Sequence, residues 1–269
     1  NLWQKTMKNV VFYGGGSISQ AIIEGLIGSG FNKENIFYVD RNSTNNKKLK
    51  KLKIRSFKKN NNAKVDLFIL AVKPKDAIDA YREILDQHKN PKVISLVAGI
   101  RSKKYINFDK KIEFLRAMPN TSSKHGLGIT AVFNSSFTKN NLKKVLIFLK
   151  KIGIVITVDK ESKIDTFTGI IGSGPAYFFY LLKSYERKLL TISNGDKKMV
   201  NEVMSNLMKG VGMSIEKNSN LDNLITAVAS KKGTTEAGLK YFKSNKLGNI
   251  FEKGLNTAIK RSKEISNEF

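Results

Sequence analysis

A glycine-rich turn between an apolar strand and a helix constrains this chain more than any other local feature. The pattern predicts a strand over residues 9–13, a turn at Gly14 and Gly16, and a helix over residues 17–29. Gly14 permits a tight turn, and Gly16 lets a pyrophosphate group approach the free N–H groups at the helix N-terminus. Ser19 fills the third position of the usual G-x-G-x-x-G/A motif as another small residue. We therefore predict a dinucleotide-binding turn here rather than a merely structural one.

Short apolar runs rich in β-branched residues alternate with helical patterns over the first 158 residues. We predict strands at residues 9–13, 35–39, 66–72, 92–97, 112–116, 129–133 and 154–158, and helices at residues 17–29, 76–87 and 139–151. Such alternation indicates βαβ units around a mostly parallel sheet. Residues 1–158 are therefore predicted to form a Rossmann-type, doubly wound α/β domain.

Longer helical patterns replace the short strands after Asp159. Residues 199–217 and 248–265 have apolar side chains at helical spacing, and residues 193–196 and 218–220 have the composition of turns between helices. We predict an all-α domain over residues 159–269, with Asp159 as the cap of its first helix.

The stretch from Thr166 to Leu182 carries no charge and is interrupted by Gly172-Ser173-Gly174-Pro175-Ala176-Tyr177. A membrane span needs about 20 mostly apolar residues, and the glycines and proline weaken a span further. We expect a buried, kinked helix. Its small residues allow close approach either of another backbone, in a core or a dimer, or of a flat ligand.

Composition excludes several classes of function. The chain has no cysteine and only two isolated histidines, so disulfides, thiol catalysis and a metal site built on Cys or His are not expected. It has 48 Lys and Arg against 22 Asp and Glu, a net charge of +26, but the lysines are spread along the whole chain. A nucleic-acid binder would concentrate them on one face. We expect no nucleic-acid or membrane partner, and a cytoplasmic location because residues 1–8 lack an apolar signal core.

Asp40 ends the second predicted strand, where a carboxylate can bind the ribose hydroxyls of NADH. Arg41 follows it and can instead hold the 2′-phosphate of NADPH. Both cofactors remain open.

Two further predicted strands end in notable turns, Ala71-Val72-Lys73-Pro74 and Met118-Pro119-Asn120-Thr121, which by themselves are also explained as a proline helix start and an ordinary turn. Together with Gly172-Ser173-Gly174-Pro175-Ala176-Tyr177 and Gly233-Thr234-Thr235, their order and spacing resemble pyrroline-5-carboxylate reductases from Lys8 to the end of the chain.

The resemblance implies a Rossmann domain joined to a helical domain that interlocks with a second subunit, in a dimer or a ring of dimers. It implies reduction of 1-pyrroline-5-carboxylate, a cyclic imine, to L-proline by NADPH or NADH, the last step of proline biosynthesis. The glycine motif and the resemblance together give the predicted cofactor-binding residues, which are Gly14, Gly16, Ser17, Ile18, Asp40, Arg41, Ala71, Val72, Lys73, Pro74, Asn120, Gly174 and Pro175.

By the same resemblance, Ser230 and the backbone of Gly233 and Thr234 hold the substrate carboxylate, and Thr235 hydrogen-bonds the ring nitrogen as the candidate catalytic residue. The family usually has Pro-Gly where this chain has Lys231-Lys232. Loss of the glycine can forbid a backbone with positive φ, or the lysines can add charge for the carboxylate.

The predicted chemistry is hydride transfer from nicotinamide C4 to the imine carbon, without a metal. Thr235 is too weak an acid to protonate the imine, so we expect it to orient the nitrogen while solvent or an already protonated imine supplies the proton. The β-hydroxyacid dehydrogenases share the two-domain plan, but Phe178 and Leu182 stand where they have a catalytic Lys and Asn. A reductase of another cyclic imine and a cofactor-binding homologue without catalysis are the remaining alternatives.

Overall fold

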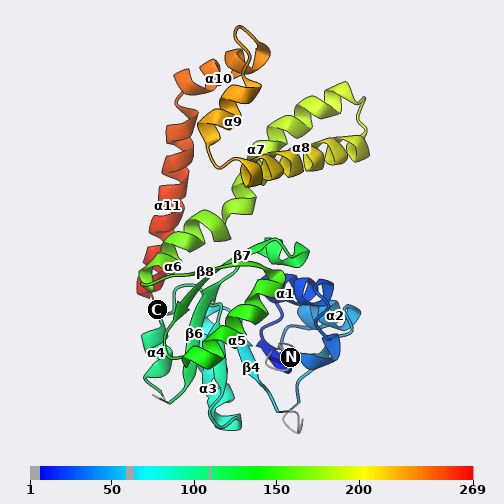
Figure 1. Ribbon diagram of the computed structural model, residues 1–269. Coiled ribbons are helices and arrows are strands. Elements are labelled where there is room, and N and C mark those ends of the chain that lie inside the picture. Colours follow the sequence, from blue (N-terminus) through cyan, green and yellow to red (C-terminus); the bar gives the residue numbers. More distant parts are fainter. Residues whose placement is uncertain (1–6, 59–63, 109–110, 269) are drawn as a thin grey trace. The chain divides into compact units, whose positions relative to one another are not determined.

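The computed structural model describes residues 7–58, 64–108 and 111–268. The chain forms two compact units. The first runs through Ser173 and resumes at Thr257, and the second is Gly174–Asn256 (Figure 1).

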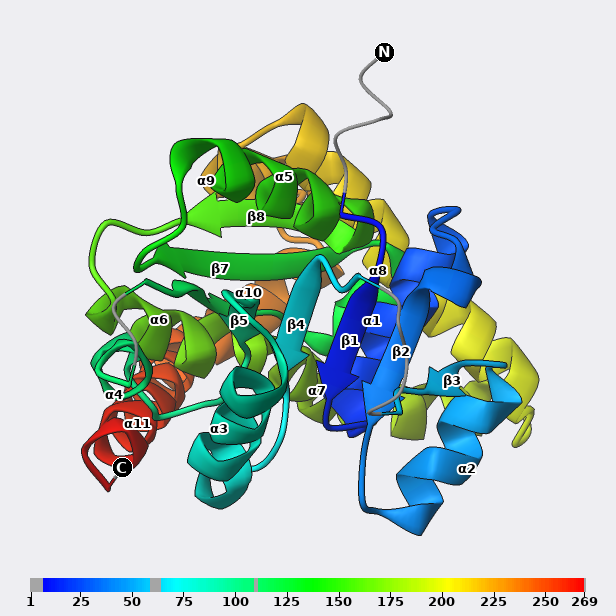
Figure 2. The ribbon, with the colours of Figure 1, turned by 90° about the horizontal axis from the view of Figure 1, so that it is seen from below.

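The first unit is built on an eight-stranded sheet. Its strands are β1 (Val10–Tyr13), β2 (Ile36–Val39), β3 (Arg55–Ser56), β4 (Leu67–Leu70), β5 (Lys92–Ser95), β6 (Glu113–Met118), β7 (Gly128–Asn134) and β8 (Gly153–Thr157). The strand order is β3-β2-β1-β4-β5-β6-β7-β8, and β1 lies between β2 and β4 (Figure 2). Only the β6–β7 pairing is antiparallel among the described strands. The predicted doubly wound α/β fold is confirmed.

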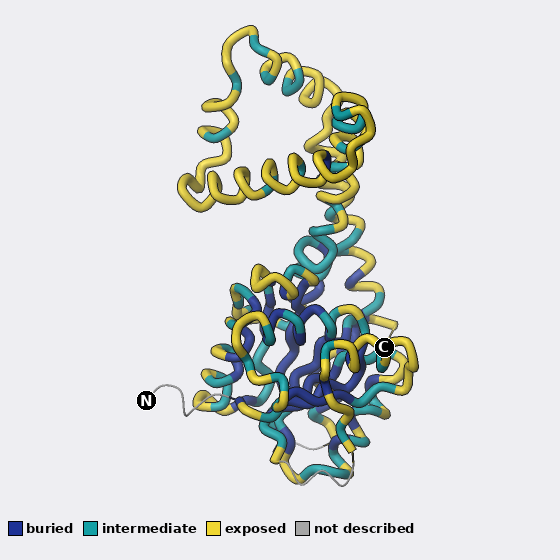
Figure 3. Tube along the Cα trace, turned by 90° about the vertical axis from the view of Figure 1, so that its right-hand side faces the viewer, coloured by how far each residue is buried: buried dark blue, intermediate teal, exposed yellow. Residues whose placement is uncertain are grey.

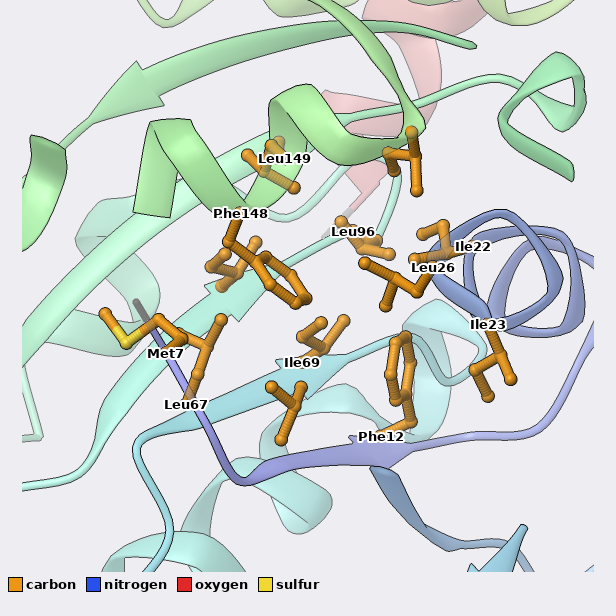
Figure 4. Packing of buried hydrophobic residues seen from close by; sticks show 14 of the residues in the cluster. Met7, Phe12, Ile22, Ile23, Leu26, Leu67, Ile69, Leu96, Phe148 and Leu149 are labelled. Atoms are coloured by element: carbon orange, nitrogen blue, oxygen red, sulfur yellow. The ribbon is translucent and has the colours of Figure 1, made fainter. Parts of the chain in front are cut away.

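Helices cover both faces of this sheet. They are α1 (Ser17–Gly28), α2 (Ser43–Lys51), α3 (Ala77–Gln87), α4 (Ser102–Ile106) and α5 (Lys139–Leu149). Strand β4 shows why both faces are apolar, because Leu67 and Ile69 belong to one buried cluster and Phe68 and Leu70 to the other. Figure 4 shows the first cluster, with Ile69 facing side chains of α1 and α5. Strand β3 and helices α2 and α4 were not predicted from the sequence.

The register brings the carboxyl ends of the central strands to one edge of the sheet. Tyr13 pairs with Val39 on one side and with Leu70 on the other, and Leu70 pairs with Ser95, which pairs with Arg116. The turns that leave β1, β2, β4, β5 and β6 therefore start side by side, where ligands bind in doubly wound sheets.

Two further helical segments belong to the first unit. Helix α6 (Ser162–Phe167) continues into a π-helix (Thr168–Gly172), and the end of α11 (Leu247–Glu268) lies against them. A Cβ atom on Gly169 would be 2.6 Å from the backbone nitrogen of Ile259, and Ser266 donates a hydrogen bond of 2.8 Å to the buried Asp165. These contacts hold the C-terminal turns of the chain to α6.

The predicted cap at Asp159 is wrong. Helix α6 begins after Glu161, whose side chain makes no capping hydrogen bond to it among the described residues. Asp159 instead forms an ion pair of 2.6 Å with Lys163.

The second unit is entirely helical, as predicted. It contains α7 (Gly174–Ile192), α8 (Lys197–Lys217), α9 (Leu221–Val228), α10 (Thr234–Ser244) and the first part of α11. The predicted turns are confirmed, because Asp196 caps α8 and Asn220 caps α9.

The uncharged stretch at residues 166–182 is interrupted as predicted, by the π-helix before Gly174. The expectation that it is buried is wrong for the single chain beyond that point. Phe179 is 68% exposed and Tyr180 is 76% exposed, and of the described residues in this unit only Val200 is buried (Figure 3). The helices of the second unit are too few to cover their own apolar side chains.

The predicted domain boundary after residue 158 falls at the end of β8 and stays a prediction. The compact units divide later, after Ser173, and the first unit regains the chain at Thr257. Within the described ranges, every helix is too short or too polar to cross a bilayer.

Candidate functional site

Gly14 forms the turn that the sequence predicts. It has a φ of +100°, and its N–H donates a 2.8 Å hydrogen bond to the carbonyl of Val39. A Cβ atom here would collide with the carbonyl oxygen of Ala71, so the turn after β1 lies directly against the turn after β4. Only glycine satisfies both the positive φ and the close approach.

The N-terminus of α1 is open. Gly16 is its N-cap residue, and no described side chain caps the helix there. A Cβ atom on Gly16 would have no described atom within 4 Å. Ser17 and Ile18 begin the helix, so the first-turn N–H groups have no intrahelical partner and can receive an anion.

Ser19 has a role that its small size alone did not suggest. Its buried hydroxyl donates a 2.6 Å hydrogen bond to the carbonyl of Gly14. It therefore fixes the turn whose geometry a cofactor would use.

Asp40 is joined to the same turn by its carboxylate. Its Oδ2 atom accepts hydrogen bonds from the Gly15 N–H at 2.5 Å and from Asn45 Nδ2 at 2.9 Å, and its Oδ1 atom accepts one from the Asn42 N–H at 2.6 Å. The Arg41 side chain is 96% exposed and lies 4.0 Å from Glu83. At the end of β2, a carboxylate fixed by hydrogen bonds is therefore followed in the chain by an exposed guanidinium.

The turn after β4 contains Ala71, Val72, Lys73 and Pro74. Ala71 and Val72 are half-buried and Lys73 is exposed, while Pro74 opens a 3-10 helix (Pro74–Asp76). The simpler explanation as a proline helix start is therefore correct for Pro74, and it is compatible with a cofactor at the same edge.

Asn120 follows β6 and is buried. Its Oδ1 atom accepts a 3.1 Å hydrogen bond from the N–H of Ile129, in β7. This bond uses one of the two lone pairs of the side-chain oxygen and fixes the orientation of the amide.

Two buried tyrosines near this edge stay protonated at neutral pH. Burial, with a further contribution from the charge of Glu83, raises the pKa of Tyr13 to about 12. Burial also raises the pKa of Tyr105 to about 12. Neither phenol is tuned to release a proton near pH 7.

The remaining predicted residues belong to the second unit, where Gly174 and Pro175 begin α7. Gly233 is the N-cap residue of α10, with no capping side chain in this described unit, and its N–H donates a 3.0 Å hydrogen bond to the Ser230 carbonyl. Thr234 and Thr235 form the first turn of α10. Ser230, Gly233 and the α10 N-terminus therefore lie together.

Lys232 answers the question raised by the missing glycine. It adopts a φ of +56°, and its N–H donates a 2.5 Å hydrogen bond to Glu236. The loss of glycine has therefore not removed the left-handed conformation. A lysine adopts it instead, at a cost in backbone strain.

Arg116 is a buried charged residue that was not predicted from the sequence. The Arg116 side chain is 2% exposed and forms an ion pair of 2.9 Å with Glu161. Arginine within an apolar strand was the signal that could have indicated it.

Across the described residues, no group of three or more His, Asp or Glu side chains could hold a metal ion.

Comparisons with known proteins cover nearly the whole chain. Residues 161–265 match a family model described as pyrroline-5-carboxylate reductase dimerisation, and residues 9–99 match one described as NADP oxidoreductase coenzyme F420-dependent. The chain is 33% identical to pyrroline-5-carboxylate reductase 1 of Bacillus subtilis (strain 168), over 97% of this chain and 90% of that protein.

Solved structures agree with this similarity. A pyrroline-5-carboxylate reductase from Coxiella burnetii matches with a TM-score of 0.82 and 28% identity, over 97% of this chain and 99% of that one. A pyrroline carboxylate reductase of Plasmodium falciparum, solved with NADP bound, matches with a TM-score of 0.83 over 97% of this chain and 99% of that one. At 21% identity the latter shows the fold alone. The full-length matches confirm the predicted pairing of a Rossmann-type domain with a helical C-terminal region.

Proposed function

Because the chain belongs to the pyrroline-5-carboxylate reductase family, we propose that it uses NADPH or NADH to reduce 1-pyrroline-5-carboxylate to L-proline, the last step of proline biosynthesis. The observation that carries the proposal is the uncapped N-terminus of α1 at Gly16, set in the strand–turn–helix geometry of a dinucleotide site.

The residues of the first unit fit such a cofactor. The open N–H groups at Ser17 and Ile18 suit the pyrophosphate, since a helix N-terminus favours an anion. Asp40 and Arg41 stand where the adenosine ribose would lie, and the turn from Ala71 to Pro74 and Asn120 stand at the following strand ends. Reduced nicotinamide supplies the hydride when bound.

The second unit supplies the groups proposed for the substrate. The Ser230 hydroxyl and the Thr234 N–H lie at the α10 N-terminus, which attracts a carboxylate. The Gly233 N–H, also predicted for the substrate, donates to the Ser230 carbonyl and would have to share or exchange that bond. Thr235 orients the ring nitrogen by a hydrogen bond, and the proton comes from solvent or from an already protonated imine. Protonation makes the imine carbon a better electrophile, so the protein needs mainly to position it.

The chain is a homo-oligomer, and we propose a dimer or a ring of dimers. The matched dimerisation model and the exposed apolar side chains of α7, α8 and α9 support this proposal, because burying them against a second copy stabilises both. The absence of nucleic-acid and membrane partners and the cytoplasmic location stay predictions.

A spectrophotometric assay tests the activity directly. Loss of NADPH or NADH absorbance upon addition of 1-pyrroline-5-carboxylate supports the proposal, and the ratio of the two rates gives the cofactor preference. Turnover only with other cyclic imines would support the alternative reductase. Cofactor binding without turnover of any imine would support a non-catalytic homologue.

A further inference from the structure

Arg116, Glu161 and Ser102 form a polar cluster inside the first unit. Arg116 Nη1 donates a 2.9 Å hydrogen bond to Glu161 Oε1. The same oxygen accepts bonds of 2.7 Å from both the N–H and the hydroxyl of Ser102. Arg116 Nη2 has no partner among the described residues, so Glu161 is the ion-pair partner of this buried cation.

The cluster joins two segments at the carboxyl edge of the central strands to the segment that follows β8, a strand that runs opposite to β6. Arg116 lies on β6, which runs into the turn at Met118 and Asn120. Ser102 begins α4 directly after the loop of residues 96–101 that follows β5, and Glu161 immediately precedes α6. Ala98, which lies in that loop, packs against Met118 in a separate, apolar group of side chains. One carboxylate therefore fixes the starts of two helices to the strand between them.

The position of these segments in the sheet gives them a functional meaning. The pyrophosphate turn follows β1, and β4, β5 and β6 succeed it in the sheet. A dinucleotide bound across the carboxyl edge starts with its adenosine half at β1 and β2 and extends its nicotinamide half over the ends of β4 to β6. The loop of residues 96–101 and the turn at Met118 therefore flank the reactive end of the cofactor.

We propose that Arg116, Glu161 and Ser102 are positioning residues for hydride transfer. They hold the loop of residues 96–101 and the β6 turn in the positions that fix the nicotinamide end of the cofactor. The role in catalysis rests on the proposed function, whereas the effect on the loop does not. A displacement of about 1 Å at a reacting centre can lower a rate by up to roughly 100-fold.

The test compares two carboxylates that tie β6 to a helix: Glu161, which is paired with Arg116, and Glu113, the first residue of the strand. The double variant Arg116→Met/Glu161→Met removes the cluster without leaving a buried, unpaired charge. The matched control is Glu113→Met, because Glu113 lies at the start of β6 and accepts hydrogen bonds from Thr138 and Asn141 at the start of α5. Both changes remove a carboxylate that ties β6 to a helix N-terminus, and only the first is at the carboxyl edge.

We expect the double variant to lower kcat by about 10- to 100-fold while the Kd for NADPH changes less than about twofold, because the pyrophosphate turn is untouched. Glu113→Met should leave kcat within about twofold of the wild type even where it lowers the melting temperature. Arg116→Lys retains a cation for Glu161, so its kcat should lie between that of the double variant and that of the wild type. Ser102→Ala removes one hydroxyl and should lower kcat by a smaller factor. This variant still tests the inference if the double variant does not fold.

Hydrogen exchange at the amides of residues 96–101 is the second measurement. Faster exchange in the double variant and in Ser102→Ala, but not in Glu113→Met, supports the inference. If the wild type fails to reduce any imine, the proposed function fails, and exchange together with the fluorescence of bound NADPH still decides whether the cluster positions this loop. Equal losses of kcat in the double variant and in Glu113→Met, or unchanged exchange in the loop, would overturn the inference.

Discussion

Gly16→Ala separates the folding of the glycine turn from its function. Gly16 has a φ of −68° and a ψ of −175°, which alanine adopts freely, and a Cβ atom there meets no described atom within 4 Å. The substitution reduces the entropy of the unfolded chain, which stabilises the fold by about 0.4–1 kcal/mol. Alanine is a poorer N-cap residue than glycine by a few tenths of a kcal/mol or more. We therefore expect the free energy of unfolding to change by less than about 0.5 kcal/mol.

The same methyl group should weaken cofactor binding strongly. It occupies the open space through which a pyrophosphate oxygen would reach the N–H groups of the first turn of α1. One hydrogen bond to a charged acceptor contributes about 1.5–3 kcal/mol, so its loss raises the Kd for NADPH by roughly 10- to 150-fold. A fluorescence titration of NADPH measures this change, and thermal unfolding measures the stability.

Gly28→Ala is the matched control, because Gly28 ends the same helix and also has open space around its Cβ position. It should leave the Kd for NADPH unchanged. Gly14→Ala should fail in both assays, because its Cβ atom would collide with the Ala71 carbonyl at a positive φ. An unchanged Kd in Gly16→Ala would refute a pyrophosphate at this helix. If Gly16→Ala lost as much stability as Gly14→Ala, the conclusion that a Cβ atom on Gly16 meets no described atom would be refuted.

Four other predictions test separate parts of the molecule. Asp40→Ser removes a carboxylate that would repel a 2′-phosphate, so the ratio of kcat/KM for NADPH to that for NADH should rise; an unchanged ratio means that Asp40 only holds the Gly15 turn. Thr235→Ala should lower kcat by about 10- to 100-fold with little change in NADPH affinity, and full activity would remove its orienting role. Lys232→Gly removes the strain of a lysine with a left-handed backbone, which is about 1–2 kcal/mol. This gain exceeds the cost of the greater entropy of glycine in the unfolded chain, so the melting temperature should rise slightly. Lys231→Gly has only the entropy cost and should lower the melting temperature. Burial lowers the pKa of His88 below 6.5, so the unfolded chain binds the proton more readily than the folded chain. The free energy of unfolding should therefore fall as the pH drops below about 6.5. Chemical denaturation of His88→Phe between about pH 8 and pH 5 should show a smaller fall in the free energy of unfolding than the wild type.

The amino-acid sequence determined the elements that depend on neighbouring residues. The strands around Phe12 and Ile69, the helix after Gly16 and the turn at Asp196 follow from apolar periodicity, from the conformational freedom of glycine and from capping side chains. These are interactions over a few residues, so they can be inferred without a fold. The four separated motifs then identified the family, because their common order is specific even where each motif alone is weak.

The tertiary structure decided what depends on residues far apart in the chain. The antiparallel β6–β7 pair, the return of Ser266 to Asp165 and the ion pair between Arg116 and Glu161 join segments that no local pattern relates. Local signals also failed where a competing contact with a residue four positions away replaced the expected one. Asp159 has the composition of a cap but pairs with Lys163, and Lys232 adopts a conformation that favours glycine because its N–H binds Glu236. Such outcomes depend on the balance of contacts in the folded chain, which periodicity and residue preference do not contain.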